Sequence, residues 1–235
     1  MPTGRQESGN LLHERSPIRS GMTTMIQSAL LSSFPSIRHA FTVKDHMLNG
    51  IRDELIIPTQ THDDTVVSVF DTNLTVVSDG LLTAISDVPI GVVTADCVPL
   101  LLFDPDKHIV GAVHAGWKGT LKHIAYKAVT SMVDLGSSFQ SIRAAIGPAI
   151  KSCCYDIPPD RTQLFIEKFG TKSVIKSRGI NYIDLQKINY QQLLSCGLSD
   201  YHIDLIPECT KCNDAYYSYR RGDRDKRMVS YIYLV

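Results

Sequence analysis

The sequence has no excess charge of either sign, because its 24 basic residues are balanced by 24 acidic ones. Proteins that bind nucleic acid or anionic lipid over a broad surface usually carry a clear excess of lysine and arginine. Long apolar runs are also missing, and none approaches the roughly 18 residues that a membrane-spanning helix needs. We therefore expect neither a nucleic acid nor a membrane as partner.

The beginning of the chain lacks the apolar stretch of an export signal. Residues 1–21 are polar, mixed in charge and rich in glycine, serine and arginine, which predicts a flexible leader ahead of a domain over 22–235. The chain contains six cysteines. Without an export signal these are expected to be free thiols or metal ligands rather than disulfides, and a cytoplasmic location is predicted.

The sequence does contain enough apolar material for a core, since 43% of its residues are hydrophobic. The runs at 89–96, 99–104 and 108–115 are almost wholly apolar, as is typical of strands buried on both faces. After residue 119, apolar residues recur at helical spacing as far as Gly136, which predicts an amphipathic helix of about four turns. Strands and helices mix along the chain without a linker. The predicted fold is a single layered α/β (α+β) domain, with a mixed central sheet flanked by helices.

The stretch TADCVPLLLFDPDKHIVGAVHAGWKGT, residues 94–120, predicts a β-hairpin whose turn is DPDK. Partner numbers that sum to about 212 would set Val98 opposite His114 and would bring Cys97 and His114 to one end. His62, in the segment PTQTH, lies just before another predicted strand and is the candidate third ligand. Two imidazoles and one thiolate suit tetrahedral zinc with a fourth position open to water or substrate.

Two other interpretations of the hairpin stay open. Cys97 and His114 could be a nucleophile and its base, as in an amidase or deamidase. They could also be structural, a buried thiol and a hydrogen-bonded strand histidine. If the site is catalytic, Asp96 is the candidate for proton handling or for orienting a histidine ligand.

Several residues near these ligands are candidates for contacts with substrate or phosphate. Gly116, Trp117 and Lys118 open the predicted helix, where free N–H groups and the helix dipole favour an anion. Gln60 lies two residues before His62. Arg220 follows a tyrosine-rich stretch, and guanidinium groups beside aromatic rings suit a substrate that is both anionic and aromatic. Alternatively, the glycines only shape a turn and the arginines belong to a solvated loop.

The remaining cysteines give a weaker pattern. Cys153 and Cys154 are neighbours, and neighbours on an extended chain point to opposite faces, so only one is expected at a site, and Cys154 is our candidate. Cys209 and Cys212 form a single CxxC motif. Structural zinc usually needs a second such pair, and the adjacent Cys153 and Cys154 make a poor one. Redox activity would need a thioredoxin-like context that is not evident. Buried thiols without a metal are the favoured interpretation.

Several segments together resemble one known family. They are PTQTH, SDGLLT, TADCVPLLLFD, GAVHAGWKGT, AAIGPAIKSCCYDI and CTKCNDAYYSYRRGDRDKR. They resemble the laccase-domain family, variously labelled polyphenol oxidase, purine nucleoside phosphorylase and peptidoglycan editing factor. The resemblance implies a cysteine-hydrolase-like fold, and zinc held by His62, Cys97 and His114. It also implies phosphorolysis of adenosine, inosine, guanosine and methylthioadenosine, together with adenosine deamination.

The chain departs from the family pattern ahead of His62. It lacks the usual GG-x-S and N-L-x segments, and Asp63 replaces the glycine that usually follows Q-x-H, so the substrate range stays open. Copper oxidation of phenols is less expected, because no methionine lies near the hairpin ends and no H-x-H pair is present. A non-catalytic zinc-stabilised protein linked to cell-wall precursor editing is a further alternative.

Overall fold

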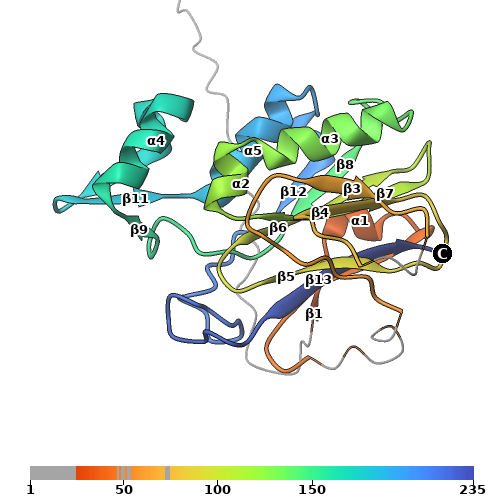
Figure 1. The fold of residues 1–235 in the computed structure, drawn as a ribbon, viewed down its shortest axis with the longest axis horizontal. Coiled ribbons are helices and arrows are strands. Elements are labelled where there is room, and N and C mark those ends of the chain that lie inside the picture. Colours follow the sequence, from red (N-terminus) through yellow and green to blue (C-terminus); the bar gives the residue numbers. More distant parts are fainter. Residues whose placement is uncertain (1–24, 47, 49–50, 52–53, 72–74) are drawn as a thin grey trace, which may run out of the picture.

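The computed structural model describes residues 25–46, 48, 51, 54–71 and 75–235 (Figure 1). The predicted leader over residues 1–21 lies outside these residues. None of the helices in the described ranges combines the length and the hydropathy needed to cross a membrane.

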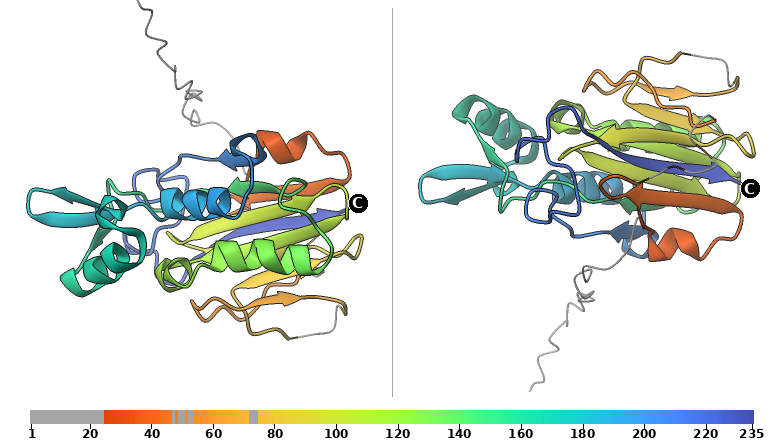
Figure 2. Two further views of the ribbon diagram at one scale, coloured as in Figure 1. Left: turned by 90° about the horizontal axis from the view of Figure 1, so that it is seen from above. Right: turned by 90° about the horizontal axis from the view of Figure 1, so that it is seen from below.

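A mixed sheet lies at the centre of the molecule (Figures 1 and 2). Six strands of the described chain form it, in the order β12 (Ile203–Leu205), β8 (Arg143–Ile146), β6 (Val98–Asp104), β7 (Ile109–Ala115), β4 (Gly80–Thr83) and β3 (Val66–Ser68). The two outer pairs are parallel, and the inner pairs are antiparallel. This confirms the prediction of an α/β fold with a mixed central sheet.

The central strands are buried on both faces, as their unbroken apolar runs predict. Every residue of β6 and β7 is buried. Because successive side chains on a strand point to opposite faces, Leu100 and Leu102 pack into the cluster that the helices share, whereas Leu101 and Phe103 pack into a second cluster with Phe41. Burial of these side chains on both sides fixes the central hairpin in the core.

A second sheet covers one face of the first (Figure 1). Its strands run in the order β1 (Met25–Ile26), β2 (Ile37–Thr42), β13 (Met228–Leu234) and β5 (Ile90–Thr94), and all its pairs are antiparallel. The short helix α1 (Ala29–Ser32) connects its first two strands. The chain passes from β5 in this sheet to β6 in the central sheet through residues 95–97, so the segment between them lies where the two sheets part.

Helices cover the opposite face. They are α2 (Trp117–Leu121), α3 (Ile124–Asp134) and α5 (Leu185–Ser195). The single helix predicted after residue 119 is therefore wrong in one respect, because two helices occupy this region. His123 adopts a left-handed conformation with φ of 62° between them. A β-carbon on Gly119 would lie 2.6 Å from the carbonyl oxygen of Asp63, so α2 packs directly against the loop that carries His62.

A smaller unit projects from the side of this layered body (Figure 2). It comprises α4 (Pro159–Phe169), the 3-10 turn η1 (Thr171–Ser173) and a three-stranded sheet in the order β10 (Val174–Ser177), β11 (Ile180–Ile183) and β9 (Asp156–Ile157). A second 3-10 turn, η2 (Asp200–His202), precedes β12. The sequence analysis did not predict the β10–β11 hairpin, in which Ile175 and Ile180 are exposed and only Ile183 is buried.

Candidate metal centre

The central hairpin brings Cys97 and His114 to the same end of the sheet. Cys97 lies immediately before β6, and His114 is the last residue but one of β7. The structure pairs Pro99 with His114 and Val98 with Ala115. The predicted pairing of Val98 with His114 is thus wrong by one residue, although both candidate ligands still lie at one end.

The turn explains this shift in register. Asp104 pairs with Ile109, so the loop takes in residues 105–108. The Asp104 carboxylate accepts hydrogen bonds from the backbone amides of Asp106 and Lys107 at 2.8 and 3.2 Å, an arrangement typical of aspartate in turns. His108 ends the loop in a left-handed conformation, with φ of 51°. The aspartate-stabilised loop has four residues, like the predicted DPDK turn, but it lies one residue further along the chain.

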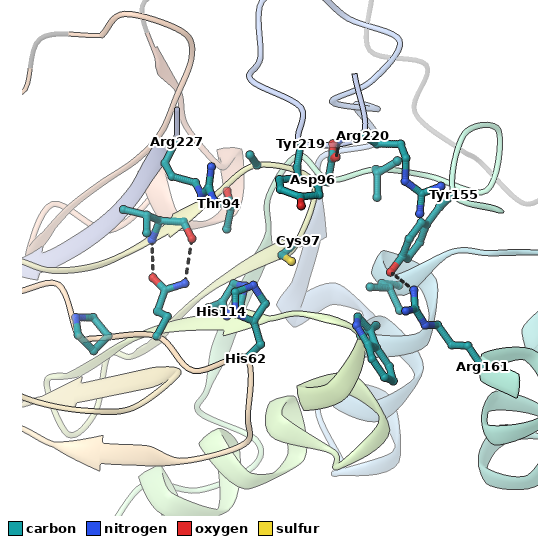
Figure 3. Close-up of a pocket in the computed structure, with 17 residues that line it drawn as sticks. His62, Thr94, Asp96, Cys97, His114, Tyr155, Arg161, Tyr219, Arg220 and Arg227 are labelled. Carbon is teal, nitrogen blue, oxygen red and sulfur yellow. Dashed lines mark hydrogen bonds between the residues drawn. The ribbon is translucent and has the colours of Figure 1, made fainter. Parts of the chain in front are cut away.

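His62 joins the pair from the loop ahead of β3 (Figure 3). One nitrogen of His62, the sulfur of Cys97 and one nitrogen of His114 all lie within 4.8 Å of one another. The two imidazole rings stand almost perpendicular, at 83°, with 4.7 Å between their centroids. The structure therefore brings together the three residues that the sequence analysis proposed as a metal site.

Asp79 holds this arrangement, and the sequence analysis did not identify it. Its buried carboxylate accepts a hydrogen bond from Nδ1 of His114 at 2.7 Å. It also accepts bonds from the backbone amides of Thr61, His62 and Asp63 at 3.2, 3.0 and 2.8 Å. One carboxylate thus fixes the ring of one histidine and the backbone of the other. An aspartate directly ahead of an apolar strand was the available signal, because a buried carboxylate needs hydrogen-bond donors.

Interactions with His114 stabilise the charged forms of both Asp79 and Cys97. Burial alone would raise the pKa of Asp79, but the hydrogen bond with His114 and others from the 61–63 loop outweigh burial and lower it to about 2. Burial would likewise raise the pKa of Cys97, but the charge of His114 and hydrogen bonds with both histidines lower it to about 6. The thiolate, which is the metal-binding and nucleophilic form of cysteine, is therefore favoured at Cys97.

Gly116 leaves room at the centre of the three ligands. A β-carbon there would lie 3.3 Å from Cε1 of His114, 3.4 Å from Sγ of Cys97 and 3.4 Å from Cδ2 of His62. The glycine thus borders a small space that all three candidate ligands face. Two imidazole nitrogens and one thiolate around such a space fit a zinc ion that keeps one position open.

Substituting Gly116 by alanine is therefore expected to weaken metal binding about tenfold, in the lower part of the range for changes beside a metal centre. The added methyl group would push on all three ligands at once. Zinc affinity measured by competition with a chromophoric chelator tests this expectation. The metal-free variant and the metal-free parent should melt at the same temperature, because the effect concerns the ligands and not the fold. Equal zinc affinities would contradict it.

The three ligands lie in a cavity of about 680 Å³. The cavity wall carries aromatic rings and three guanidinium groups (Figure 3). The lining residues are Pro58, Gln60, His62, Val93, Thr94, Ala95, Asp96, Cys97, His114, Trp117, Ile150, Tyr155, Arg161, Leu185, Tyr219, Arg220 and Arg227. Arg161 lies with its guanidinium carbon 4.1 Å from the centroid of the Trp117 ring, and that of Arg220 lies 5.0 Å from the Tyr155 ring. The sequence analysis missed Tyr155, Arg161, Tyr219 and Arg227.

The structure assigns different positions to the predicted substrate contacts. Trp117 and Arg220 line the cavity, as does Gln60. The Gln60 side-chain amide, however, is paired with the backbone of Val93 through bonds of 2.9 and 2.7 Å, so it fixes the cavity wall. Lys118 is not a lining residue, and its ammonium group lies 5.7 Å from the centroid of the Trp117 ring. The arginines, rather than Lys118, supply positive charge here.

Asp96 holds a loop and does not orient a histidine. Its carboxylate accepts hydrogen bonds from the hydroxyls of Thr210 and Ser218 at 2.7 and 3.1 Å, and from the backbone amide of Arg220 at 2.7 Å. The orienting role predicted for Asp96 belongs to Asp79. Asp96 instead fixes the backbone that presents Arg220 to the cavity.

Cys154 does not line the cavity either. The prediction that Cys153 and Cys154 face opposite sides is wrong because the chain is not extended there. Lys151 accepts hydrogen bonds from the amides of Cys154 and Tyr155 at 2.9 and 2.8 Å, which closes a turn. Both thiols consequently lie on the same side, next to those of Cys209 and Cys212.

Known proteins are similar to this chain in sequence and in fold. A Clostridium acetobutylicum protein named purine nucleoside phosphorylase is 34% identical over 177 residues, which cover 74% of this chain and 74% of the relative. A protein named adenosine deaminase RL5, from an unknown prokaryotic organism, is 31% identical over 198 residues, covering 77% and 75%. The crystal structure of the hypothetical protein YfiH of Bacillus licheniformis superposes with a TM-score of 0.80 at 28% identity, and the match covers 94% of this chain and all of that one.

The family assignment rests on most of the chain. Residues 38–235 match the family described as multi-copper polyphenol oxidoreductase laccase. This range includes the three candidate ligands and Asp79, and it extends to the last strand. It also includes the motifs whose resemblance was noted from the sequence. The chain belongs to this laccase-like family.

Proposed function

We propose that this chain is a zinc-dependent purine nucleoside phosphorylase. The observation that carries the proposal is the cavity itself, in which the ligand set of His62, Cys97 and His114 faces aromatic rings and three arginines. Its volume of about 680 Å³ falls within the usual range for small-molecule sites. Adenosine, inosine, guanosine and methylthioadenosine are the candidate substrates, and the names of related proteins support this class.

The donor set favours zinc over copper. Two histidines and a cysteine also occur in blue-copper sites, but those usually add a weak axial methionine. No methionine lines the described part of the cavity. Among the described residues, the groups able to hold a metal are this triad and a cluster of four cysteines, and neither resembles a cluster of histidine pairs. When bound, zinc supplies a Lewis acid that neutralises charge on phosphate or activates water.

Side chains of the cavity would bind the substrates and orient the metal ligands. Arg161, Arg220 and Arg227 offer guanidinium groups that suit the oxygens of a phosphate. Trp117 and Tyr155 offer rings on which a purine can stack. Asp79 keeps the Nδ1 proton of His114 in place, which leaves Nε2 free to act as a ligand. Asp96 is a positioning residue, because it holds the backbone of Arg220.

The experiment is a nucleoside screen with the purified protein, with phosphate present or absent, and with zinc present or removed by chelator. Release of free purine base that needs both phosphate and zinc is the expected result. Conversion of adenosine to inosine without phosphate would identify deamination as a second activity. If the zinc-loaded protein forms neither free base nor inosine from any of the four nucleosides, the proposal is wrong.

One observation favours a second candidate. Cys97, His114 and Asp79 stand in the order of a nucleophile, a base and an orienting carboxylate, which is the arrangement of cysteine amidases. His62 separates the two functions, because it belongs to the metal site but not to the nucleophilic triad. A His62→Ala variant should lose zinc and phosphorolysis together if the metal acts. Amide hydrolysis that survives in this variant without metal would favour the amidase.

A further inference from the structure

Four cysteine sulfurs meet beside the cavity, at a place separate from the three-ligand centre. They belong to Cys153, Cys154, Cys209 and Cys212, and all lie within 4.8 Å of one another. The sulfur of Cys153 lies 3.5 Å from those of Cys209 and Cys212, and the sulfur of Cys154 lies 3.3 Å from that of Cys212. Two distant parts of the chain therefore supply two thiols each.

These separations suit a shared metal ion better than a covalent bond. A disulfide needs its sulfurs about 2.05 Å apart, which is far shorter than these sulfur–sulfur distances. Four sulfurs that each lie about 2.3 Å from one zinc ion, at the corners of a tetrahedron, are about 3.8 Å apart. Three of the sulfur contacts, of 3.3 to 3.5 Å, lie slightly below that value, and no pair of the four sulfurs is more than 4.8 Å apart. Each of the four is a free cysteine.

Backbone hydrogen bonds bring the two segments of the cluster together. Ala149 and Cys209 form a parallel bridge, in which the amide of Thr210 donates to the carbonyl of Ala149 at 3.1 Å. The Cys209 sulfur also accepts hydrogen bonds from the backbone amides of Lys151 and Cys212. Amide donors of this kind stabilise a thiolate. The turn at Lys151 and the CxxC loop therefore present four sulfurs to one point.

We propose that these four cysteines bind a second zinc ion. Four thiolates so close together would repel one another unless a cation lay between them. Zinc accepts four thiolate ligands in tetrahedral geometry, and such a site has no open position, which is the pattern of structural zinc. The sequence analysis had judged the adjacent pair a poor partner for the CxxC motif at a zinc site, whereas the turn at Lys151 brings both of its thiols to that motif.

The second ion would link the two loops that form one side of the cavity. Cys154 is followed directly by Tyr155, which lines the cavity. Cys209 is followed by Thr210, whose hydroxyl donates to Asp96 at 2.7 Å, and Asp96 in turn holds the backbone of Arg220. A zinc ion at the cluster would therefore position Tyr155 and Arg220, whose groups lie in contact, without touching the substrate.

Metal counting on the full chain tests the proposal. Native mass spectrometry of the zinc-loaded protein is expected to show two zinc ions per chain. A Cys97→Ser variant should keep one, and a Cys209→Ser, Cys212→Ser double variant should also keep one. The matched control is Cys196→Ala, which removes a buried thiol that lies outside both groups and should leave two ions bound. Cobalt bound to the Cys97→Ser variant should show the strong absorption of a centre with several thiolates.

Alkylation of the unmodified protein gives a test that does not depend on any variant folding. Cys153 and Cys212 are exposed, so iodoacetamide should label them rapidly if no metal is bound. We expect all four cysteines to stay unlabelled until a chelator is added. Rapid labelling in the presence of zinc, a single zinc ion in the parent protein, or a mass that reveals a disulfide among the four would each overturn the proposal. Cys212→His, which keeps a zinc ligand, should retain both ions if the double variant does not fold.

Discussion

A Cys97→Ser variant is expected to lose the zinc proposed at His62, Cys97 and His114, and its kcat/KM for the proposed phosphorolysis is expected to fall about a thousandfold. Serine is a poor ligand for zinc, and the two remaining histidines hold the ion weakly. A metal that neutralises charge in the transition state supplies several kcal/mol, and about 1.4 kcal/mol corresponds to a tenfold change in rate. Steady-state kinetics with phosphate and a purine nucleoside, run alongside metal analysis, measures both effects.

The design of this experiment separates the metal from the fold. Cys97 lies immediately before β6 and is partly exposed to the cavity, so the serine variant should retain its circular dichroism spectrum. Cys196→Ala is the control, because that cysteine is buried in the helix-side core, away from the cavity, and its loss should leave zinc and activity at the parent values. Unchanged kcat/KM in the Cys97 variant would show that the three metal ligands do not act in the reaction.

The sequence predicts local features of this protein well. The runs that form β6 and β7 are strongly apolar because both strands are covered on both faces, and that pattern is visible without coordinates. The hairpin follows from two such runs separated by DPDK. Its register does not follow, because the position of the turn depends on the Asp104 carboxylate bonding to two amides. The observed register therefore differs by one residue from the predicted one, at a turn that a single carboxylate stabilises.

Features that depend on tertiary contacts were predicted poorly. Arg161 lies on α4 and Arg227 lies just before β13, so only the packing of the projecting unit and of the C-terminal strand brings them to one cavity. The four-cysteine cluster likewise requires the bridge between Ala149 and Cys209, which follows the parallel pairing of β8 with β12. The three candidate ligands were suggested by residue type and by family resemblance, because spacing alone does not show that distant loops meet.

The second large effect is expected for Asp79→Asn. One carboxylate oxygen of Asp79 accepts bonds from the His114 ring and from the amide of His62, and the other accepts from Thr61 and from the amide of Asp63. Asparagine keeps the size but replaces one acceptor oxygen with an NH₂ donor, which would face donors on that side. We expect the zinc affinity of the His62, Cys97 and His114 site to fall by roughly 10- to 100-fold, which is the usual effect of removing a group that orients a ligand histidine.

The same substitution is expected to destabilise the metal-free protein by about 3 kcal/mol, because buried donors would be left without an acceptor. Urea unfolding in the presence of chelator measures this part, and chelator competition measures the zinc affinity. Asp63→Asn is the matched control, since its side chain is half exposed and pairs with Lys122 at the surface, where an ion pair contributes little. If both variants bind zinc as the parent does, His114 does not need Asp79 to present its free nitrogen. If only Asp79→Asn is impaired, the buried carboxylate is what joins the 61–63 loop to the central hairpin and makes one site of three distant residues.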